Sequence, residues 1–154
     1  MIEAAEMGAG DRVLEVGTGS GYAAAVVSRI AGQVHTVERH AELTQSARER
    51  NARLNYDNIA FHTGDGTLGW AQAAPFDAII VAAGGPVVPP PLREQLAIGG
   101  RLVMPIGRAG RQRLIRLRHV SQDAFEEDVL DEVSFVPLIG AYGWATSADS
   151  LRAP

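Results

Sequence analysis

Short apolar runs alternate with more polar segments over residues 1–106, and this pattern predicts strands separated by helices. Nearly continuous apolar runs bounded by glycine or proline are typical of buried strands. Glycines and prolines also mark where the intervening helices end and begin. Alternating strands and helices indicate βαβ units and a mostly parallel sheet. The predicted strands are residues 12–16, 34–38, 59–63, 76–82 and 101–106, and the predicted helices are residues 1–7, 22–31, 41–54 and 92–96.

The remainder of the chain carries two further strand-like stretches, at residues 112–120 and 129–138. The segment between them is too short for a crossover helix, so an antiparallel hairpin is expected at the end of the sheet. The prediction is an α/β, Rossmann-like fold with a mostly parallel seven-stranded sheet and a C-terminal antiparallel hairpin. This fold is expected to form one domain over residues 1–140, followed by a loose C-terminal tail at residues 141–154.

Composition narrows the chemistry that this fold can carry. The chain of 154 residues has a formal net charge of −4, which does not favour nucleic acid or an anionic membrane as a partner. It contains no cysteine, which excludes disulfides and thiolate chemistry, and no lysine, which excludes Schiff-base chemistry. The four histidines show no metal-ligand spacing, so no metal site is expected. Because no basic leader and no membrane-spanning stretch are present, the sequence predicts a cytoplasmic protein.

The most informative segment is a glycine-rich turn between the first predicted strand and the helix that follows it. Glycines within residues 17–21 permit positive φ angles and a close approach of the backbone to a ligand. The turn opens a helix, and the amides at a helix N-terminus favour a carboxylate. Glu15 lies inside the apolar strand just before the turn, where a carboxylate is costly without a partner such as an ammonium group. The methionine part of S-adenosylmethionine carries both a carboxylate and an ammonium group.

Two more acidic residues follow the next two predicted strands. Glu38 ends the second strand, where an acid can accept hydrogen bonds from ribose hydroxyls. Asp65 follows the third strand between two glycines, where it can accept from an adenine amino group while a flanking amide faces a ring nitrogen. The carboxyl ends of parallel strands share one edge of the sheet, so these acids and Glu15 are expected to form one nucleotide-type site. The expected cofactor contacts are Glu15, Gly17, Thr18, Gly19, Ser20, Gly21, Glu38, Asp65 and Gly66.

Other interpretations of the same residues stay open. Each of these features can serve structure alone. The glycine turn can be a tight connection between strand and helix, Glu38 can cap the following helix, and Asp65 can be an ordinary turn residue. Residues 19–24 also fit the dinucleotide fingerprint, with Glu38 near the position of a ribose-binding acid, which is the pattern of a nicotinamide-dependent oxidoreductase. Glu15, Gly17, Asp65 and the terminal hairpin favour an S-adenosylmethionine-dependent methyltransferase, because a dehydrogenase needs none of them.

The sequence resembles the protein-L-isoaspartate O-methyltransferase family over nearly the whole chain, to about Leu138. The run Gly-Thr-Gly-Ser-Gly-Tyr at residues 17–22 is the family's form of the cofactor loop and is more specific than the general methyltransferase pattern. Phe-Val-Pro-Leu at residues 135–138 resembles the segment that lines the family's substrate site. Further segments that are similar to the family lie at residues 35–39, 64–70, 75–83 and 96–107.

The resemblance implies an O-methyltransferase that uses S-adenosyl-L-methionine, releases S-adenosyl-L-homocysteine and acts on the carboxylate of isoaspartyl residues in damaged proteins. Its implied partners are therefore isoaspartyl peptides or proteins, with no nucleic acid and no membrane. The substrate carboxylate is already ionised near neutral pH, so no strong base is required and no side chain is assigned a catalytic role. The substrate-binding residues that the resemblance implies are Ala82, Ala83, Val136, Pro137 and Leu138.

One departure from the family concerns the start of the chain. Family members carry several dozen residues before the first strand, including a Thr-Ile-Ser-Gln-Pro-like segment that contacts the substrate carboxylate and covers the cofactor. Residues 1–7 are expected to be the last turns of the helix that follows that segment. The resemblance therefore implies cofactor binding more strongly than catalysis, and a cofactor-binding module without activity is the alternative. Apolar surface left uncovered at the N-terminal face would favour a homo-oligomer.

Overall fold

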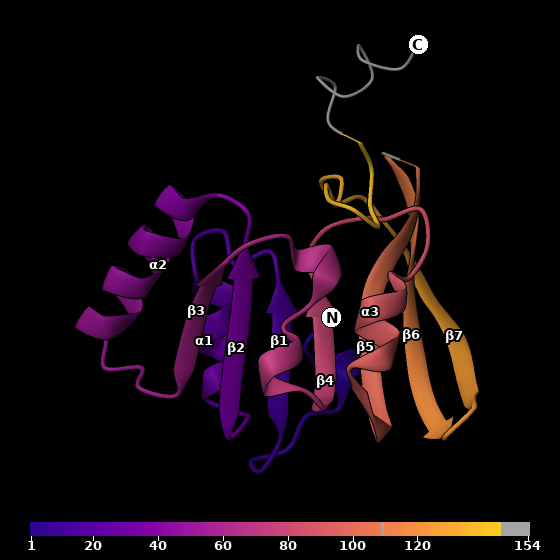
Figure 1. The fold of residues 1–154 in the computed structure, drawn as a ribbon, viewed down its shortest axis with the longest axis horizontal. Helices are drawn as coiled ribbons and strands as arrows, with labels where there is room; N and C mark the ends of the chain where they lie inside the picture. Colours follow the sequence, from indigo (N-terminus) through magenta and orange to yellow (C-terminus); the bar gives the residue numbers. More distant parts are fainter. Residues whose placement is uncertain (109, 146–154) are drawn as a thin grey trace.

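The computed structural model describes residues 1–108 and 110–145, and these residues form an α/β structure around one sheet (Figure 1). The strands are β1 (Arg12–Val16), β2 (Gln33–Glu38), β3 (Ile59–Thr63), β4 (Phe76–Val81), β5 (Leu96–Arg108), β6 (Arg111–Ser121) and β7 (Ala124–Val133). The α-helices are α1 (Tyr22–Ser28), α2 (Ala41–Arg53) and α3 (Pro90–Glu94), and the 3₁₀ helices are η1 (Glu3–Ala5), η2 (Gly66–Leu68) and η3 (Ala71–Ala73).

The sheet has seven strands in the order β3-β2-β1-β4-β5-β6-β7. The pairs from β3 to β5 are parallel, and β6 pairs antiparallel with both β5 and β7. This arrangement confirms the predicted Rossmann-like fold with an antiparallel hairpin at its C-terminal end.

A hydrophobic core on each face of the sheet holds the helices in place. On one face, Val27 of α1 and Ala5 of η1 belong to the same buried cluster as Val13 of β1. On the other face, Leu92 of α3 is buried in a cluster with Leu14 of β1. Successive side chains of a strand point to opposite faces, so a strand covered on both faces needs apolar residues at both kinds of position. This requirement explains the continuous apolar runs in the sequence.

The predicted boundary between α3 and β5 is wrong. The sequence places a helix at residues 92–96 that ends at two glycines, but α3 ends at Glu94 and Leu96 already pairs with Phe76 of β4. The pairing then shifts register before Ala78, and Gly99 has a φ angle of 83°. Both glycines therefore lie within β5, at an irregular pairing where Gly99 needs a positive φ, and they do not end a helix.

The terminal hairpin is present, but its second strand both begins and ends earlier than the predicted residues 129–138, since β7 ends at Val133. The sequence starts this strand at Val129 and treats the acidic run before it as a loop, whereas β7 begins at Ala124. Asp128, in that acidic run, lies opposite Arg116 of β6. Opposite charges that face each other across a strand pair stabilise the pairing, which explains why a charged run forms a strand here.

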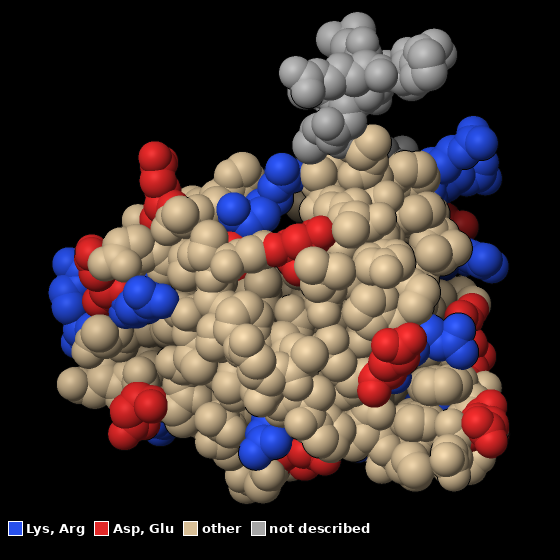
Figure 2. Space-filling view, in the orientation of Figure 1, with Lys and Arg blue, Asp and Glu red and all other residues tan. Residues whose placement is uncertain are grey.

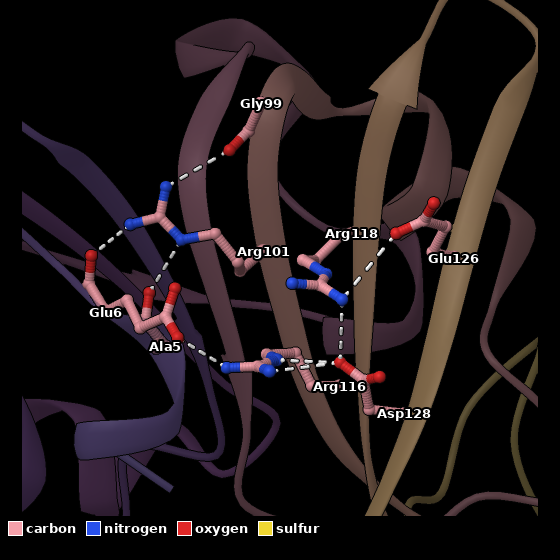
Figure 3. A network of polar contacts seen from close by, with 8 residues as sticks. All are labelled: Ala5, Glu6, Gly99, Arg101, Arg116, Arg118, Glu126 and Asp128. Carbon is pink, nitrogen blue, oxygen red and sulfur yellow. Dashed lines mark hydrogen bonds and ion pairs between the residues drawn. The ribbon is translucent and has the colours of Figure 1, made fainter.

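A network of charged groups and carbonyls joins the N-terminal segment to the sheet (Figure 3). The Arg116 guanidinium lies 2.5 Å from the Glu6 carboxylate and 3.0 Å from the Asp128 carboxylate. Arg101 of β5 donates hydrogen bonds to the carbonyl oxygens of Ala5 and Glu6. These contacts and the burial of Ala5 hold the start of the chain, which the sequence predicts as a helix end and which forms η1, against the sheet.

In Figure 2, charged side chains lie over α2, over β6 and β7, along the lower edge and in a small group at the upper middle of the face, and the area between them is uncharged. Among the described residues, no helix is long and apolar enough to cross a membrane.

The first residues of the predicted tail contact the domain, because the amides of Ala141 and Tyr142 donate hydrogen bonds to Asp65 and Thr67. Residues 146–154 of that tail lie outside the described residues, and the domain boundary at residue 140 stays a prediction.

Candidate functional site

A cleft of about 480 Å³ opens at the carboxyl ends of β1, β2 and β4. β2 and β3 lie on one side of β1 in the sheet, and β4 and β5 lie on its other side, so the strand order reverses at β1. Open α/β sheets bind ligands at this kind of switch point, beyond the carboxyl ends of the strands. The lining comes from the ends of these strands, from the start of α2 and from the segment after β7, which meets them there.

The turn between β1 and α1 depends on its glycines for its shape. Gly17, Gly19 and Gly21 have φ angles of 98°, 52° and 81°. A Cβ at Gly21 would lie 2.6 Å from the Asn51 side chain, because α2 packs directly against the turn. A Cβ at Gly19 would meet no atom within 4 Å, and Gly19 lines the cleft. The open side of Gly19 is therefore where a ligand can approach the backbone closely.

Glu38 joins this turn to the end of β2. Its Oε2 accepts a hydrogen bond from the Gly19 amide at 3.0 Å, and its Oε1 accepts one from the His40 amide at 3.1 Å. An ionised carboxylate has about four acceptor positions, so Glu38 keeps acceptors for hydroxyl groups of a ligand. Glu38 is buried by its neighbours yet lines the cleft, where such hydroxyls would lie.

Glu15 lies behind the turn, in a chain of buried hydroxyl groups. The Thr36 hydroxyl donates to Glu15 Oε2 at 2.5 Å, and the Thr18 and Thr36 hydroxyl oxygens are also 2.5 Å apart. The Glu15 side chain is 1% exposed, and burial raises its pKa to about 7; the nearby charge of Glu38 adds to this rise, and the hydrogen bond from Thr36 opposes it. Glu15 therefore changes its ionisation near neutral pH, and a cation bound close by would favour its charged form.

Asp65 lies in a hollow that shares Arg39 and Ile139 with the cleft. Its Oδ1 accepts hydrogen bonds from the amide and the hydroxyl of Thr67 at 2.9 and 2.7 Å, and its Oδ2 accepts one from the Ala141 amide at 2.7 Å. Burial acts to raise the pKa of Asp65, but these hydrogen bonds and the charge of Arg39 outweigh it, so the pKa lies below its ordinary value. Asp65 is therefore an ionised acceptor beside the cleft.

The opposite side of the cleft combines the end of β4 with residues 135–138, which we call the wall segment. This segment runs beside Gly84, whose amide donates to the Val136 carbonyl at 2.8 Å and whose carbonyl accepts from the Leu138 amide at 2.9 Å. These hydrogen bonds bring the wall segment, which lies far from β4 in the sequence, against the end of β4. All the predicted substrate-binding residues line the cleft: Ala82, Ala83, Val136, Pro137 and Leu138.

The predicted cofactor residues fall into four groups by position, and their contacts with a cofactor stay predictions. Those that line the cleft are Gly17, Gly19, Glu38 and Gly66. Those behind or beside it are Glu15 and Thr18 in the hydroxyl chain, Ser20 and Gly21 at a groove between α1 and α2, and Asp65 in the adjoining hollow.

Sequence reasoning missed Thr36 and Gln112, two buried residues that support the cleft from behind. Thr36 connects Glu15 to the turn, and its only sequence signal is a polar side chain within an apolar run. Gln112 bonds to the backbone of the wall segment and lies in an arginine-rich stretch that gives no signal at all. Within residues 1–108 and 110–145, no group of three His, Cys, Asp or Glu side chains is arranged to hold a metal ion.

The fold and the position of the cleft define the class of protein as one with a Rossmann-like methyltransferase fold. A solved protein-L-isoaspartate O-methyltransferase superposes with a TM-score of 0.85 at 32% identity, covering 92% of this chain and 46% of that one. A Plasmodium falciparum structure of the same enzyme name, in complex with S-adenosyl-L-homocysteine, gives a TM-score of 0.70 at 26% identity and covers 90% of this chain and 69% of that one.

The chain belongs to the protein-L-isoaspartate(D-aspartate) O-methyltransferase family, whose family model matches residues 1–143. The protein-L-isoaspartate O-methyltransferase of Brucella anthropi is 54% identical over 145 residues, which are 94% of this chain and 67% of that protein. Protein-L-isoaspartate O-methyltransferase 1 of Rhodopseudomonas palustris is 53% identical over 99% of this chain and 63% of its own length. The chain thus spans about two thirds of the length of these curated relatives.

Proposed function

We propose that this chain is an S-adenosylmethionine-dependent O-methyltransferase that esterifies the carboxylate of isoaspartyl residues in damaged proteins. The observation that carries the proposal is a single cleft with two chemically different sides. One side carries the glycine turn and Glu38, and the other carries the wall segment and the end of β4. Membership of the protein-L-isoaspartate O-methyltransferase family supports this assignment of the two sides.

The glycine side of the cleft fits S-adenosylmethionine. The open position at Gly19 leaves room for the methionine part against the turn, and the free acceptors of Glu38 suit the ribose hydroxyls. Asp65, ionised and next to the cleft, suits the adenine amino group. When bound, this cofactor supplies an electrophilic methyl group on a sulfonium sulfur.

The wall side has the properties needed to present a carboxylate without a strong base. A carboxylate is already ionised near neutral pH, so the chain needs to align and desolvate it rather than remove a proton. Val136, Pro137 and Leu138 supply apolar surface and backbone groups at the cleft, and Ala82 and Ala83 leave space beside them. Rate then depends on how firmly the wall segment is held, because alignment is the main contribution of this chain.

Transfer of a labelled methyl group from S-adenosylmethionine to an isoaspartyl peptide tests the proposal. The matched control is a peptide of the same sequence with an ordinary aspartyl residue. The expected result is a base-labile methyl ester on the isoaspartyl peptide alone. Equal labelling of both peptides, or methyl transfer to neither, would contradict the proposed substrate.

The same assay separates the proposal from a module that binds the cofactor without turnover. Binding of S-adenosylhomocysteine without methyl transfer to the isoaspartyl peptide would support the alternative. A cytoplasmic location and self-association stay predictions, to be tested by fractionation and by sedimentation.

A further inference from the structure

The side chain of Gln112 in β6 forms hydrogen bonds with the backbone of the wall segment. Its side chain is 2% exposed, and its Oε1 accepts a hydrogen bond from the Phe135 amide at 2.7 Å. Its Nε2 donates to the Phe135 carbonyl at 3.2 Å. A carboxamide that bonds to both backbone groups of one residue replaces the two bonds that an antiparallel strand partner would make. Gln112 therefore continues the pairing of the chain after β7 has ended at Val133.

Gly84 makes room for this arrangement. A Cβ at Gly84 would overlap the carboxamide of Gln112, so a larger residue there and the glutamine cannot both keep their places. Gly84 also forms hydrogen bonds with Val136 and Leu138, and its carbonyl accepts a further one from the Trp144 indole at 3.0 Å. The carboxamide of Gln112 and the backbone of Gly84 together fix where the wall segment lies relative to β4.

We propose that Gln112 is a positioning residue for the substrate side of the cleft. It does not line the cleft, and it acts through the Phe135 backbone on Val136, Pro137 and Leu138, which do. The inference rests on the proposed function, because it takes the wall segment as the part that holds the peptide substrate. Misplacement of a binding group by about 1 Å can slow an enzyme roughly a hundredfold, so a positioning residue has a measurable effect without touching the substrate.

The chain contains a matched control for Gln112. Gln95 is also buried, at 7% exposure, and it also bonds to backbone: the Trp70 amide donates to its Oε1 at 2.7 Å, and its Nε2 donates to the Leu68 carbonyl at 2.8 Å. A Cβ at Gly69 would overlap its carboxamide, as one at Gly84 would overlap that of Gln112. Gln95 therefore makes the same kind of contact, but its partners Leu68 and Trp70 do not line the cleft.

The experiment compares Gln112→Met with Gln95→Met in the full chain. Methionine keeps the length of the side chain and removes both hydrogen bonds, so both variants are expected to lower the unfolding temperature. Gln112→Met should lower kcat/KM for an isoaspartyl peptide by between about tenfold and a hundredfold. Its affinity for S-adenosylhomocysteine, measured by calorimetry, should stay within about twofold of the wild type, which is near the limit of such comparisons. Gln95→Met should leave kcat/KM for the peptide at saturating S-adenosylmethionine unchanged.

Amide hydrogen exchange gives a second readout that does not depend on turnover. Gln112→Met should speed exchange at Phe135 and Leu138, and Gln95→Met should speed it at Trp70 instead. If Gln112→Met does not fold, Gln112→Glu serves in its place at a pH that keeps the new carboxylate ionised, because an ionised carboxylate can accept from the Phe135 amide but cannot donate to the Phe135 carbonyl. Gln95→Glu is then the control.

The proposal is overturned if the Gln112 variant keeps the wild-type kcat/KM, or if both variants lower kcat/KM equally. Unchanged exchange at Phe135 and Leu138 would also overturn it. Failure of the proposed function is a different result and is visible in the wild type alone, as S-adenosylhomocysteine binding without methyl transfer to the peptide. In that case the exchange data decide whether Gln112 holds the wall segment.

Discussion

Replacing Glu15 with glutamine should change how the stability of this protein depends on pH. Glutamine has nearly the same size as glutamate and keeps an oxygen that can accept the hydrogen bond from Thr36. It removes the ionisable group, which is 1% exposed in the folded chain. The variant therefore separates the cost of burying a charge from the packing of the side chain.

The magnitude follows from the pKa of Glu15, which burial raises from 4.5 to about 7. Between these values the folded state keeps a proton that the unfolded state releases, so the stability of the wild type falls as pH rises through this window. Each pKa unit corresponds to 1.36 kcal/mol, so the full loss above pH 7 is about 3 kcal/mol. Glu15→Gln has no such loss, and its stability relative to the wild type should increase by that amount between acid and alkaline pH.

Urea unfolding of both proteins at pH 5 and at pH 8.5, at one salt concentration, measures this difference. Glu94→Gln, on the exposed surface of α3, controls for the removal of one carboxylate. The difference between Glu15→Gln and the wild type should be small at pH 5 and large at pH 8.5. An equal difference at both pH values would refute the argument that Glu15 is neutral in the folded protein below pH 7.

Other substitutions test the glycine turn and the core. Gly19→Val should abolish binding of S-adenosylhomocysteine in calorimetry, and retained binding would contradict the site. Its cost in stability should be only the about 1–2 kcal/mol of its positive φ angle, because no protein atom lies where its Cβ would be. Gly21→Ala should instead lower the unfolding temperature, because its Cβ would meet Asn51, and an unchanged temperature would contradict that packing. Phe76→Ala, at a fully buried site, should cost about 3–5 kcal/mol in urea unfolding, and a cost below about 1 kcal/mol would contradict its place in the core.

The fold was predictable because its signals are local. Apolar runs such as residues 76–82 identify the central strands, and the glycines of residues 17–21 identify the turn at the end of β1. The ends of parallel strands must meet at one edge, so Glu38 and Asp65 could be placed near each other from the sequence alone. The structure has Glu38 in the cleft lining and Asp65 in the adjoining hollow.

What could not be predicted depends on contacts between residues far apart in the chain. The sequence alone indicates a loop for the acidic run before Val129. It forms a strand because Asp128 lies opposite Arg116 of the neighbouring strand. The sequence alone indicates a helix end at Gly99. The glycine is needed instead because the irregular pairing of β5 with β4 requires a positive φ there. Gln112 carries no motif, and its role depends on the Phe135 backbone reaching it after the hairpin has formed.

Calorimetric titration of the wild type and of Glu38→Ala with S-adenosylhomocysteine, with NADH as the competing ligand, decides whether the cleft binds S-adenosylmethionine through Glu38. We expect the wild type to bind one S-adenosylhomocysteine per chain and not to bind NADH. Glu38→Ala should bind S-adenosylhomocysteine at least about tenfold more weakly, since it loses charge-assisted hydrogen bonds. Preferential binding of NADH, or equal affinity of both proteins for S-adenosylhomocysteine, would contradict this expectation.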